Sequence, residues 1–511
     1  MNGTKAIRNM TAALLLGLLL TGTASGCLRS ADSEAELNEN ETPAEEAEAA
    51  ETERKTFEDM IAEYENLQAG EPAEGVGYAG TAEAVGSQNS EPAVSVTEDE
   101  AEAASAPLQV QEAFAAVSDP GTYQAVTASY STYNQGLTGD TPLFTERDLA
   151  QNADLSEASA VTMRDNAVID ITEEGVYVLS GTASECTVRV TADEEAKVQL
   201  VLNGVSVTNS DYPAIYVLSA DKVFITTAEN TDNAMRVTGS FRSDSETGTN
   251  TDAVIFSKED LVLNGLGSLT VESSYGNGVT TKDDLKITGG AWTVTSALDA
   301  FEANDSIAAC GGTVVISTNK DGLHCENDDN DSFGWIWIGG GDWTVNAKSD
   351  GIQGTPFVQV DDGTLRINGS EGIEATYVQI NGGTIDIYGS DDGINASRKS
   401  SAYYPTIEIN GGDLTVEVGP GDTDGIDSNG DIVVNGGTIR VTASMSSFDY
   451  DGSAAYNGGT IYVNGQQVDG IPQSMMGGGG GFGGFGGGGF GGGFGGGFGG
   501  GFGGGGRGGR G

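Results

Sequence analysis

Short runs in which Val, Ile, Leu and Thr alternate with polar residues fill the chain between residues 155 and 470. Many of these runs close with Asn-Gly or Gly-Gly, and no helical stretch interrupts them. Alternation with a period of two is typical of β-strands, and such glycine pairs are typical of turns. The pattern therefore predicts an all-β domain at residues 155–470, built from short strands.

The runs recur with a period near 22 residues, marked by a glycine corner and, about nine residues later, by an acidic-Gly-aliphatic triplet such as Asp350-Gly-Ile. Without helices between parallel strands, a unit of this length must coil on itself, so that equivalent strands pair at roughly 4.8 Å. The repeat thus predicts a parallel β-helix, a solenoid of about 22 residues per coil. The corner glycines are Gly290, Gly312, Gly341, Gly363, Gly383, Gly412, Gly437 and Gly459.

The alternation also assigns inward and outward positions. Two and four residues after each corner glycine stand aliphatic residues or Trp, as at Trp292 and Val294. Three and five residues before it stands a second apolar row, as at Leu285 and Ile287, and the aliphatic residue of each triplet forms a third. We expect these three rows to point inward and to form the core.

The N-terminal residues predict export. Lys5 and Arg8 precede an apolar stretch at residues 12–20, too short to span a bilayer permanently, and Cys27 closes a segment similar to the bacterial lipoprotein box. We therefore expect a signal peptide at residues 1–26 and a lipid anchor at Cys27, on the extracellular face of the bacterial cell membrane. A plain secretory signal is the alternative.

Composition divides the rest of the chain. Residues 27–118 are rich in Glu and Ala, residues 119–154 lead into the strands, and residues 471–511 are almost entirely Gly and Phe. Neither the spacer nor the tail has the apolar density to form a core, so both are predicted to be disordered.

Charge and cysteine content narrow the classes of function. A formal net charge of −53 would repel phosphate backbones, which excludes nucleic acid as a partner. Cys186, Cys310 and Cys325 contain no CxxC pair and are expected to be buried free thiols. We expect a monomer.

Acidic residues share one phase of the repeat, so that Asp299, Asp321 and Asp350 should stack one coil apart. Carboxylates at that spacing repel by roughly 1 kcal/mol even in water, and Ca²⁺ would offset the repulsion with its preference for oxygen ligands. The alternative is that these residues only form turns and bond backbone groups. A lone His324 cannot form a zinc site. The candidate calcium ligands are Asp283, Asp299, Glu302, Asp305, Asp321, Glu326 and Asp328.

Aromatic residues mark a candidate binding surface. Trp335 and Trp337 alternate with inward Ile residues, which places both indoles outside, and Phe357 and Tyr377 follow at the phase of Trp335. Two insertions, residues 324–335 and 395–405, should project beside this ladder and form a trough for sugar rings. An aromatic stack that only stabilises the solenoid is the alternative. The candidate carbohydrate-binding residues are Trp335, Trp337, Phe357, Tyr377, Tyr403, Tyr404 and Arg398.

Ordered blocks such as "VQLVLNGVSVTNSDYPAIYV" and the serial "NGGTI" units resemble the bacterial extracellular carbohydrate-binding domain-containing proteins over about residues 154–464. The resemblance implies a right-handed β-helix like that of polysaccharide lyases. It also implies calcium-assisted, non-catalytic binding of cellulose or an acidic plant-type polysaccharide at the cell surface.

Two other functions remain open from the sequence. A calcium-dependent polysaccharide lyase would need a strong base, for which Lys282 is the best-placed residue, although it has no basic neighbour to activate it. The third possible function is that of a purely architectural surface protein or adhesin.

Overall fold

The computed structural model describes residues 115–116, 125–128, 137–138, 142–421 and 423–472. All described residues belong to the unit Asp99–Gly511. The predicted signal peptide, the lipid anchor at Cys27, nearly all of the spacer and almost the whole Gly/Phe tail lie outside the described residues. Within them, no helix has both the length and the apolar character required to cross a membrane.

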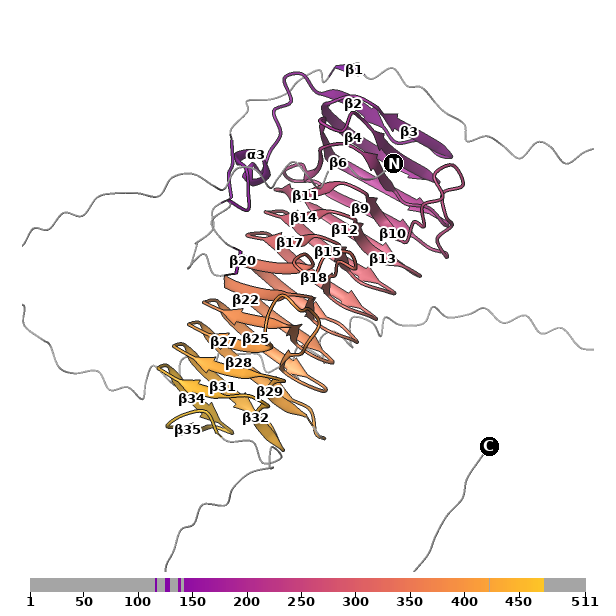
Figure 1. Cartoon of the computed structure of the whole chain (residues 1–511). Helices are drawn as coiled ribbons and strands as arrows, with labels where there is room; N and C mark the ends of the chain where they lie inside the picture. Colours follow the sequence, from indigo (N-terminus) through magenta and orange to yellow (C-terminus); the bar gives the residue numbers. More distant parts are fainter. Residues whose placement is uncertain (1–114, 117–124, 129–136, 139–141, 422, 473–511) are drawn as a thin grey trace, which may run out of the picture. The chain divides into compact units, whose positions relative to one another are not determined.

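The described part of the chain is almost entirely β, with one short helix, α3 (Glu146–Leu149). Twelve strands form one sheet, here called the small sheet, which Figure 1 shows as a stack from β3 to β32. Its strands are β3 (Ala167–Ile171), β5 (Cys186–Thr191), β7 (Ile215–Ser219), β10 (Ala253–Ser257), β13 (Asn277–Thr281), β16 (Phe301–Ala303), β19 (Leu323–Cys325), β21 (Ile352–Gly354), β23 (Ile373–Ala375), β26 (Ile394–Ala396), β29 (Asp424–Ser428) and β32 (Ser446–Tyr450).

The other 23 strands form the large sheet, which has two rows on either side of the glycine corners. Four long strands run through a corner and belong to both rows. The first row, which precedes the corners, further contains β1 (Ala115–Ala116), β2 (Ser159–Thr162), β8 (Lys222–Thr227), β11 (Asp260–Gly265), β14 (Asp284–Ile287), β17 (Ser306–Ala309), β24 (Tyr377–Ile380), β27 (Thr406–Ile409), β30 (Asp431–Val434) and β33 (Ala454–Tyr456).

The second row follows the corners. The long strands are β4 (Gly175–Ser184), β6 (Lys197–Asn209), β20 (Trp335–Asn346) and β22 (Phe357–Gly369). The remaining strands of the second row are β9 (Asp232–Val237), β12 (Ser268–Ser273), β15 (Ala291–Ser296), β18 (Thr313–Thr318), β25 (Thr384–Gly389), β28 (Asp413–Val418), β31 (Thr438–Thr442), β34 (Thr460–Val463) and β35 (Gln466–Val468).

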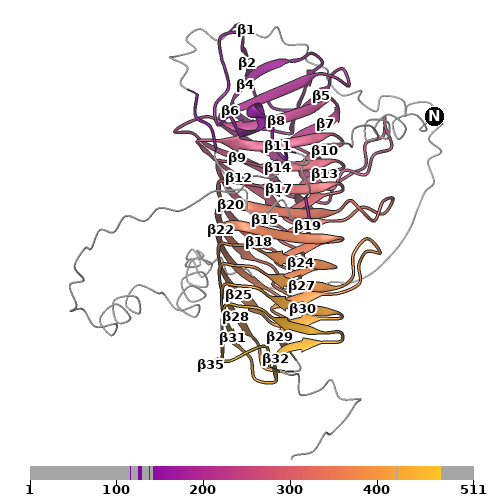
Figure 2. The same cartoon turned by 60° about the vertical axis from the view of Figure 1, so that its left-hand side comes forward.

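Apart from β1 and β35, the strands pair in parallel with their equivalents in neighbouring repeats. In the first row, Leu285 of β14 pairs with Ile307 of β17, which pairs with Ile336 of β20. Antiparallel pairs between named strands occur only at the two ends of the described stack, as β1–β2 and β34–β35. Figure 2 shows the same stack from the side. The predicted all-β class with parallel strands one repeat apart is confirmed.

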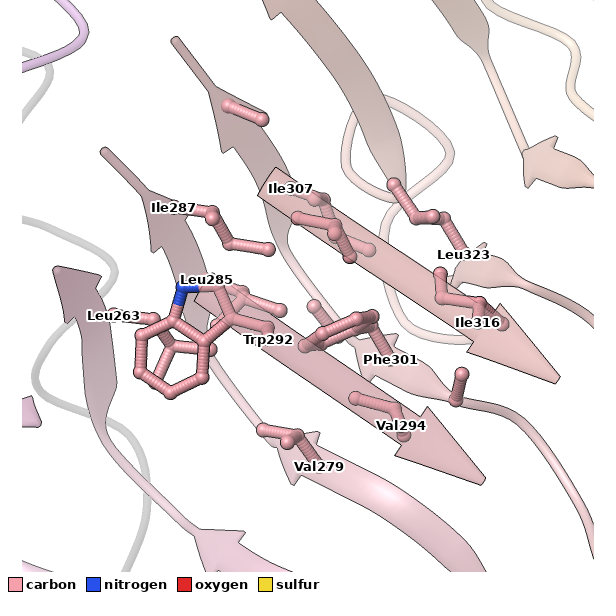
Figure 3. Close-up of a cluster of buried hydrophobic side chains, with 14 of the residues drawn as sticks. Leu263, Val279, Leu285, Ile287, Trp292, Val294, Phe301, Ile307, Ile316 and Leu323 are labelled. Carbon is pink, nitrogen blue, oxygen red and sulfur yellow. The ribbon is translucent and has the colours of Figure 1, made fainter. Parts of the chain in front are cut away.

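The three rows predicted to point inward form the core, as Figure 3 shows for one section of it. Leu285, Trp292 and Phe301, one from each row, are at most 1% exposed. The corner allows this packing because Gly290 has a φ of 84°, which other residues adopt only with strain, and the indole N–H of Trp292 donates to the carbonyl of Gly289 at 2.6 Å.

One outer surface of the first row is covered by a segment that we call the strap, residues 142–151. Its helix α3 starts with a capping box in which Thr145 and Asp148 bond each other's backbone N–H groups, and it contacts β11. Part of the predicted lead-in, residues 119–154, is therefore packed on the folded domain.

Candidate functional site

The outer surface of the small sheet carries a column of polar side chains, which we call the outer column. Parallel register aligns Thr280 with Glu302, then His324, Gln353, Glu374, Asn395 and Asp427. The sequence analysis singled out Glu302 but not the column. The signal was present, because each member from Glu302 onward follows the acidic residue of its repeat by three positions, as Thr280 follows Asn277.

The predicted acidic column lies beside the outer column and is held by backbone hydrogen bonds. The carboxylate of Asp299 accepts the backbone N–H of Asp321 at 3.0 Å, and Asp321 accepts that of Asp350 at 3.0 Å. Asp392 accepts the N–H of Asp424 at 2.9 Å. The backbone role expected as the alternative to calcium is thus observed, and each bond links one repeat to the next.

Two side chains that can carry positive charge, Lys320 and His324, contact one part of the acidic column. Lys320 Nζ lies 2.7 Å from Asp299 Oδ2, and His324 Nδ1 lies 3.4 Å from carboxylate oxygens of both Asp299 and Asp321. Although burial opposes it, the contact with Asp299 raises the pKa of His324. Burial lowers the pKa of Lys320, but the contact with Asp299 outweighs burial, so that the pKa of Lys320 is also raised. The nearby carboxylates therefore favour the charged forms of both cations.

A pocket of about 580 Å³ opens on this surface, between β16, β19 and the first insertion. It is strongly polar, and Lys282 Nζ lies 3.2 Å from Glu302 Oε1 at one side. Phe333 adds an aromatic ring that is 40% exposed. The lining residues are Lys282, Glu302, Ala303, Asn304, Asp305, His324, Glu326, Asn327, Asp328, Asp329, Asn330 and Phe333.

The seven predicted calcium ligands lie at three places on this side of the molecule. Asp299 and Asp321 cluster with His324, whereas Asp283 clusters with Asp260 and Asp284, with one ligand atom of each residue within 4.8 Å of the others. The remaining four, Glu302, Asp305, Glu326 and Asp328, line the pocket. The sequence predicts these seven residues as one cluster. The structure separates them, because the period of the repeat alone does not show where a loop places a side chain.

The Asp299 cluster and the Asp283 cluster differ in how far their carboxylates are already compensated by cationic groups. Lys320 and His324 already contact the carboxylates of the Asp299 cluster. In the other cluster, burial together with Asp260, Asp284 and Asp305 raises the pKa of Asp283 to about 7. Lys222 contacts Asp260 there, at 3.5 Å. This cluster, with oxygen donors and little compensation, is the better fit for a divalent cation.

A third carboxylate cluster, Asp350 with Glu371 and Glu374, was not among the predicted ligands. Burial and the neighbouring Glu374 and Asp350 raise the pKa of Glu371 to about 8. Lys399 of the second insertion lies 2.5 Å from Glu374. The second insertion therefore reaches back over the small sheet.

The predicted aromatic ladder exists on the outside of the first row. The Trp335 ring stacks on that of Phe357 with centroids 5.5 Å apart, and Tyr403 meets both Phe357 and Tyr377 edge to face. Register places Phe357 opposite Tyr377. The phase assignment of the ladder is therefore correct.

The predicted exposure of this ladder is wrong at two positions. Trp337 is 2% exposed and Phe357 is 3% exposed, so neither ring presents a flat face to solvent. Phe144 of the strap packs on Trp337, and the Trp337 indole N–H donates to Asp361 at 2.9 Å. Alternation predicts which side of the sheet a residue occupies but not what covers that side.

The predicted trough between the two insertions is closed. Ser400 Oγ donates to the carbonyl of Asp331 at 2.8 Å, and Ser401 Oγ donates to the Asp331 carboxylate at 2.6 Å. Tyr403 fills the space over Phe357 and Tyr377. Of the predicted carbohydrate-binding residues, Tyr404, at 51% exposure, and Arg398 are exposed.

Comparison with known proteins gives a consistent family. A family model described as carbohydrate-binding domain-containing protein matches residues 165–423. A protein of that name from Acetivibrio thermocellus is 33% identical over 217 residues, which span 42% of this chain and 75% of the relative.

One solved structure is also similar, described as the polysaccharide lyase-like protein from C. thermocellum in a gadolinium derivative. It has 30% sequence identity and a TM-score of 0.37, over 46% of this chain and 88% of the other. The family model covers about half of this chain and the relative is matched over three quarters of its length, so the chain belongs to the carbohydrate-binding domain-containing protein family.

Proposed function

We propose that this chain binds polysaccharide, without cleaving it, at the outer surface of the small sheet. The pocket beside the first insertion is the observation that carries the proposal. Its volume of about 580 Å³ is within the range of small-molecule sites and suits one or two sugar rings. Carboxylates and amides in its wall can bond sugar hydroxyls, and the ring of Phe333 can meet the apolar face of a pyranose.

The outer column supports a long ligand rather than a single sugar. Glu302, His324, Gln353 and Glu374 repeat along the stack at the strand spacing of roughly 4.8 Å. We also propose that the stack is a right-handed parallel β-helix, in which this spacing would continue along the whole side of the domain.

Calcium is the second part of the proposal. The residues that would hold it are Asp260, Asp283 and Asp284, where carboxylates cluster with little compensation. When bound, the ion would supply positive charge next to Asp305, a residue of the pocket wall. An acidic polysaccharide would need that charge, because the pocket wall contains five carboxylates, Glu302, Asp305, Glu326, Asp328 and Asp329. A neutral polysaccharide such as cellulose would not need the positive charge of the ion.

The absence of cleavage is inferred from the candidate bases. Lys282 is paired with Glu302 at 3.2 Å, and Lys320 is paired with Asp299 at 2.7 Å. Although burial opposes it, the contact with Asp299 raises the pKa of Lys320, which makes this lysine a poor general base. The calcium-dependent lyase remains the enzymatic alternative.

The proposed setting is the extracellular face of the cell membrane, where a lipid on Cys27 and the acidic spacer would hold a monomeric binding domain away from the bilayer. The N-terminal sequence supports this setting through its signal-like residues and its lipoprotein-like cysteine.

Affinity-gel electrophoresis on cellulose derivatives, xylan and polygalacturonate, with and without chelator, tests the proposal. We expect retardation without product, and we expect Phe333→Ala and Glu302→Gln to reduce it while Met445→Ala, at an exposed site outside the pocket, leaves it unchanged. Release of unsaturated uronides, followed by ultraviolet absorbance, would favour the lyase. Migration unchanged on every glycan would favour the architectural reading.

A further inference from the structure

The strap carries a buried carboxylate that is held as a bound ligand would be. Asp148 is 0% exposed, and its two oxygens face two different lysines. Oδ1 lies 3.4 Å from Lys222 Nζ and Oδ2 lies 3.3 Å from Lys286 Nζ. A buried carboxylate is costly unless charge and hydrogen bonds compensate it. The pair of lysines on β8 and β14 thus forms a binding site for a carboxylate.

The surface beneath the strap also recognises neutral polar groups. Thr288 Oγ1 donates to the carbonyl of Asp148 at 2.6 Å, and Asn264 Nδ2 donates to the carbonyl of Ala150 at 3.0 Å. The backbone N–H of Gly265 donates to Gln151 Oε1 at 3.1 Å. All three donors belong to the stacked strands or the turn that follows one, and all point outward into the strap.

An aromatic surface completes this face. Phe144 lies on the indole of Trp337, with ring centroids 5.9 Å apart, in a cluster with Ala308 and Cys310. The face therefore presents paired ammonium groups, a hydroxyl and an amide donor, and an indole. Together these groups match a sugar that carries a carboxylate, hydroxyls and an apolar ring face.

The strap contributes no strand to the two sheets. Its contacts with the first row run through side chains, together with its own backbone carbonyls, while β8, β11, β14 and β17 pair with one another in parallel without it. It also precedes residue 165, where the family match begins. A segment joined in this way can open locally while the stack beneath it stays folded.

From these contacts we infer that the strap is an internal ligand, which covers a second glycan-binding face whose external ligand is a carboxylated polysaccharide. Asp148 stands in for the sugar carboxylate, and Phe144 stands in for its ring. This inference rests on the proposed function, since it assigns the chain a second glycan surface. Lys222 also contacts Asp260 at 3.5 Å, which leaves Lys286 as the main partner for an incoming carboxylate.

The wild-type chain provides the first test. We expect added oligogalacturonate to speed hydrogen exchange at the backbone amides of residues 143–151, because the ligand competes with the strap. A cello-oligosaccharide of equal length is the matched neutral ligand and should leave exchange unchanged. If neither ligand changes the exchange, or if oligogalacturonate slows it, the inference is wrong.

Variants of the strap provide the second test. A Cβ added at Gly289 would meet Gln151 Oε1 at 1.6 Å, so Gly289→Ala should displace the Gln151 side chain and break its hydrogen bonds to Gly265 and Thr288, which hold the end of the strap. Phe144→Ala should weaken the ring contact of the strap. Gly470→Ala, whose Cβ would meet only one ring atom at 3.9 Å, is the control. With chelator present, we expect about tenfold tighter retention of the two strap variants on polygalacturonate, as for a tenfold rise in the open population.

Two further variants separate this inference from the proposed function. Adding Lys286→Ala to Gly289→Ala should abolish the gain, whereas adding Phe333→Ala, which alters the pocket, should leave it intact. A gain that survives Lys286→Ala, or strap amides that remain fully protected in both strap variants, would overturn the inference. Loss of neutral-glycan retention in Phe333→Ala alone bears only on the pocket.

Discussion

The outer surface of the small sheet and the outer surface of the first row are built by the same repeat but differ in what lies over them. On the small sheet, the column from Glu302 to Asp427 is polar and runs beside an open pocket, and Lys399 of the second insertion covers it only at Glu374. On the first row, the strap and Tyr403 cover Trp337 and Phe357. The comparison shows that a repeat determines which side a residue faces, whereas segments outside the repeat determine whether a ligand can reach it.

The comparison predicts that aromatic residues on the two surfaces have opposite roles. Trp337→Ala removes a 2% exposed indole and its hydrogen bond to Asp361, and we expect a loss of about 3–5 kcal/mol in the free energy of unfolding. Phe333→Ala, at 40% exposure, should cost less than about 1 kcal/mol and act on binding instead. Urea denaturation measures both, and equal losses would remove the distinction.

Hydrogen-bonded asparagines on the outside of the first row allow a finer comparison. Asn381, 2% exposed, donates to Asp361 at 2.7 Å and accepts from Asn410 at 2.8 Å. Asn381→Ala would remove one hydrogen bond from Asp361 and one from Asn410. We expect the free energy of unfolding to fall by about 1–3 kcal/mol.

The row of hydrogen-bonded asparagines continues with Asn435, which donates to Asn410 at 2.7 Å. It ends at Asn457, which is exposed and donates to Asn435 at 2.7 Å. Because water can replace its bond, we expect Asn457→Ala to change the free energy of unfolding by less than about 0.5 kcal/mol. Equal effects of the two substitutions in urea denaturation would mean that burial does not set the strength of these hydrogen bonds.

The sequence predicted the interior better than the surface for a physical reason. Alternation and the corner glycines are local signals, and they placed Trp292 and Leu285 correctly in the core. The cover over Trp337 depends on Phe144, 193 positions earlier in the chain and in a segment without periodicity. No local pattern carries that contact.

The candidate site likewise contains features that the period of the repeat predicts and features that depend on the loops. The stacking of Asp299 on Asp321 followed from the period, and so did the outward phase of Trp335. The closure of the trough depends on Ser401 meeting Asp331, two loop residues whose conformations no repeat specifies. The pocket likewise depends on how the first insertion folds over Glu302.

The outer column should also make stability depend on pH. Burial, with Asp392, Asp424, Asp449 and Asp451 nearby, raises the pKa of Asp427 to about 7. The folded chain therefore keeps a proton that the unfolded chain releases above about pH 4, so the free energy of unfolding falls as pH rises from about 4 to 7. One group contributes at most about 1.4 kcal/mol per pH unit.

Asp427→Asn should remove this contribution and narrow the difference in stability between pH 5 and pH 8. Urea denaturation at both pH values, with chelator present, gives the measurement. Asp165→Asn, in the turn before β3 and away from the acidic columns, is the matched control. An unchanged difference in Asp427→Asn would show that Asp427 does not hold the proton in the folded chain.

The smallest effect is expected at Tyr404, where the second insertion leaves a ring 51% exposed. Tyr404→Ala should change the free energy of unfolding by less than about 0.5 kcal/mol, because the ring has little packing to lose. Retention on glycan gels should change less than it does in Phe333→Ala, since Phe333 lines the pocket and Tyr404 does not. If Tyr404→Ala instead abolishes retention while Phe333→Ala does not, the ligand meets the closed insertions rather than the pocket. The polar outer surface of the small sheet would then be a consequence of the repeat, stabilised by hydrogen bonds such as that from the Asp321 N–H to Asp299. The covered outer surface of the first row would be the one that evolved for binding.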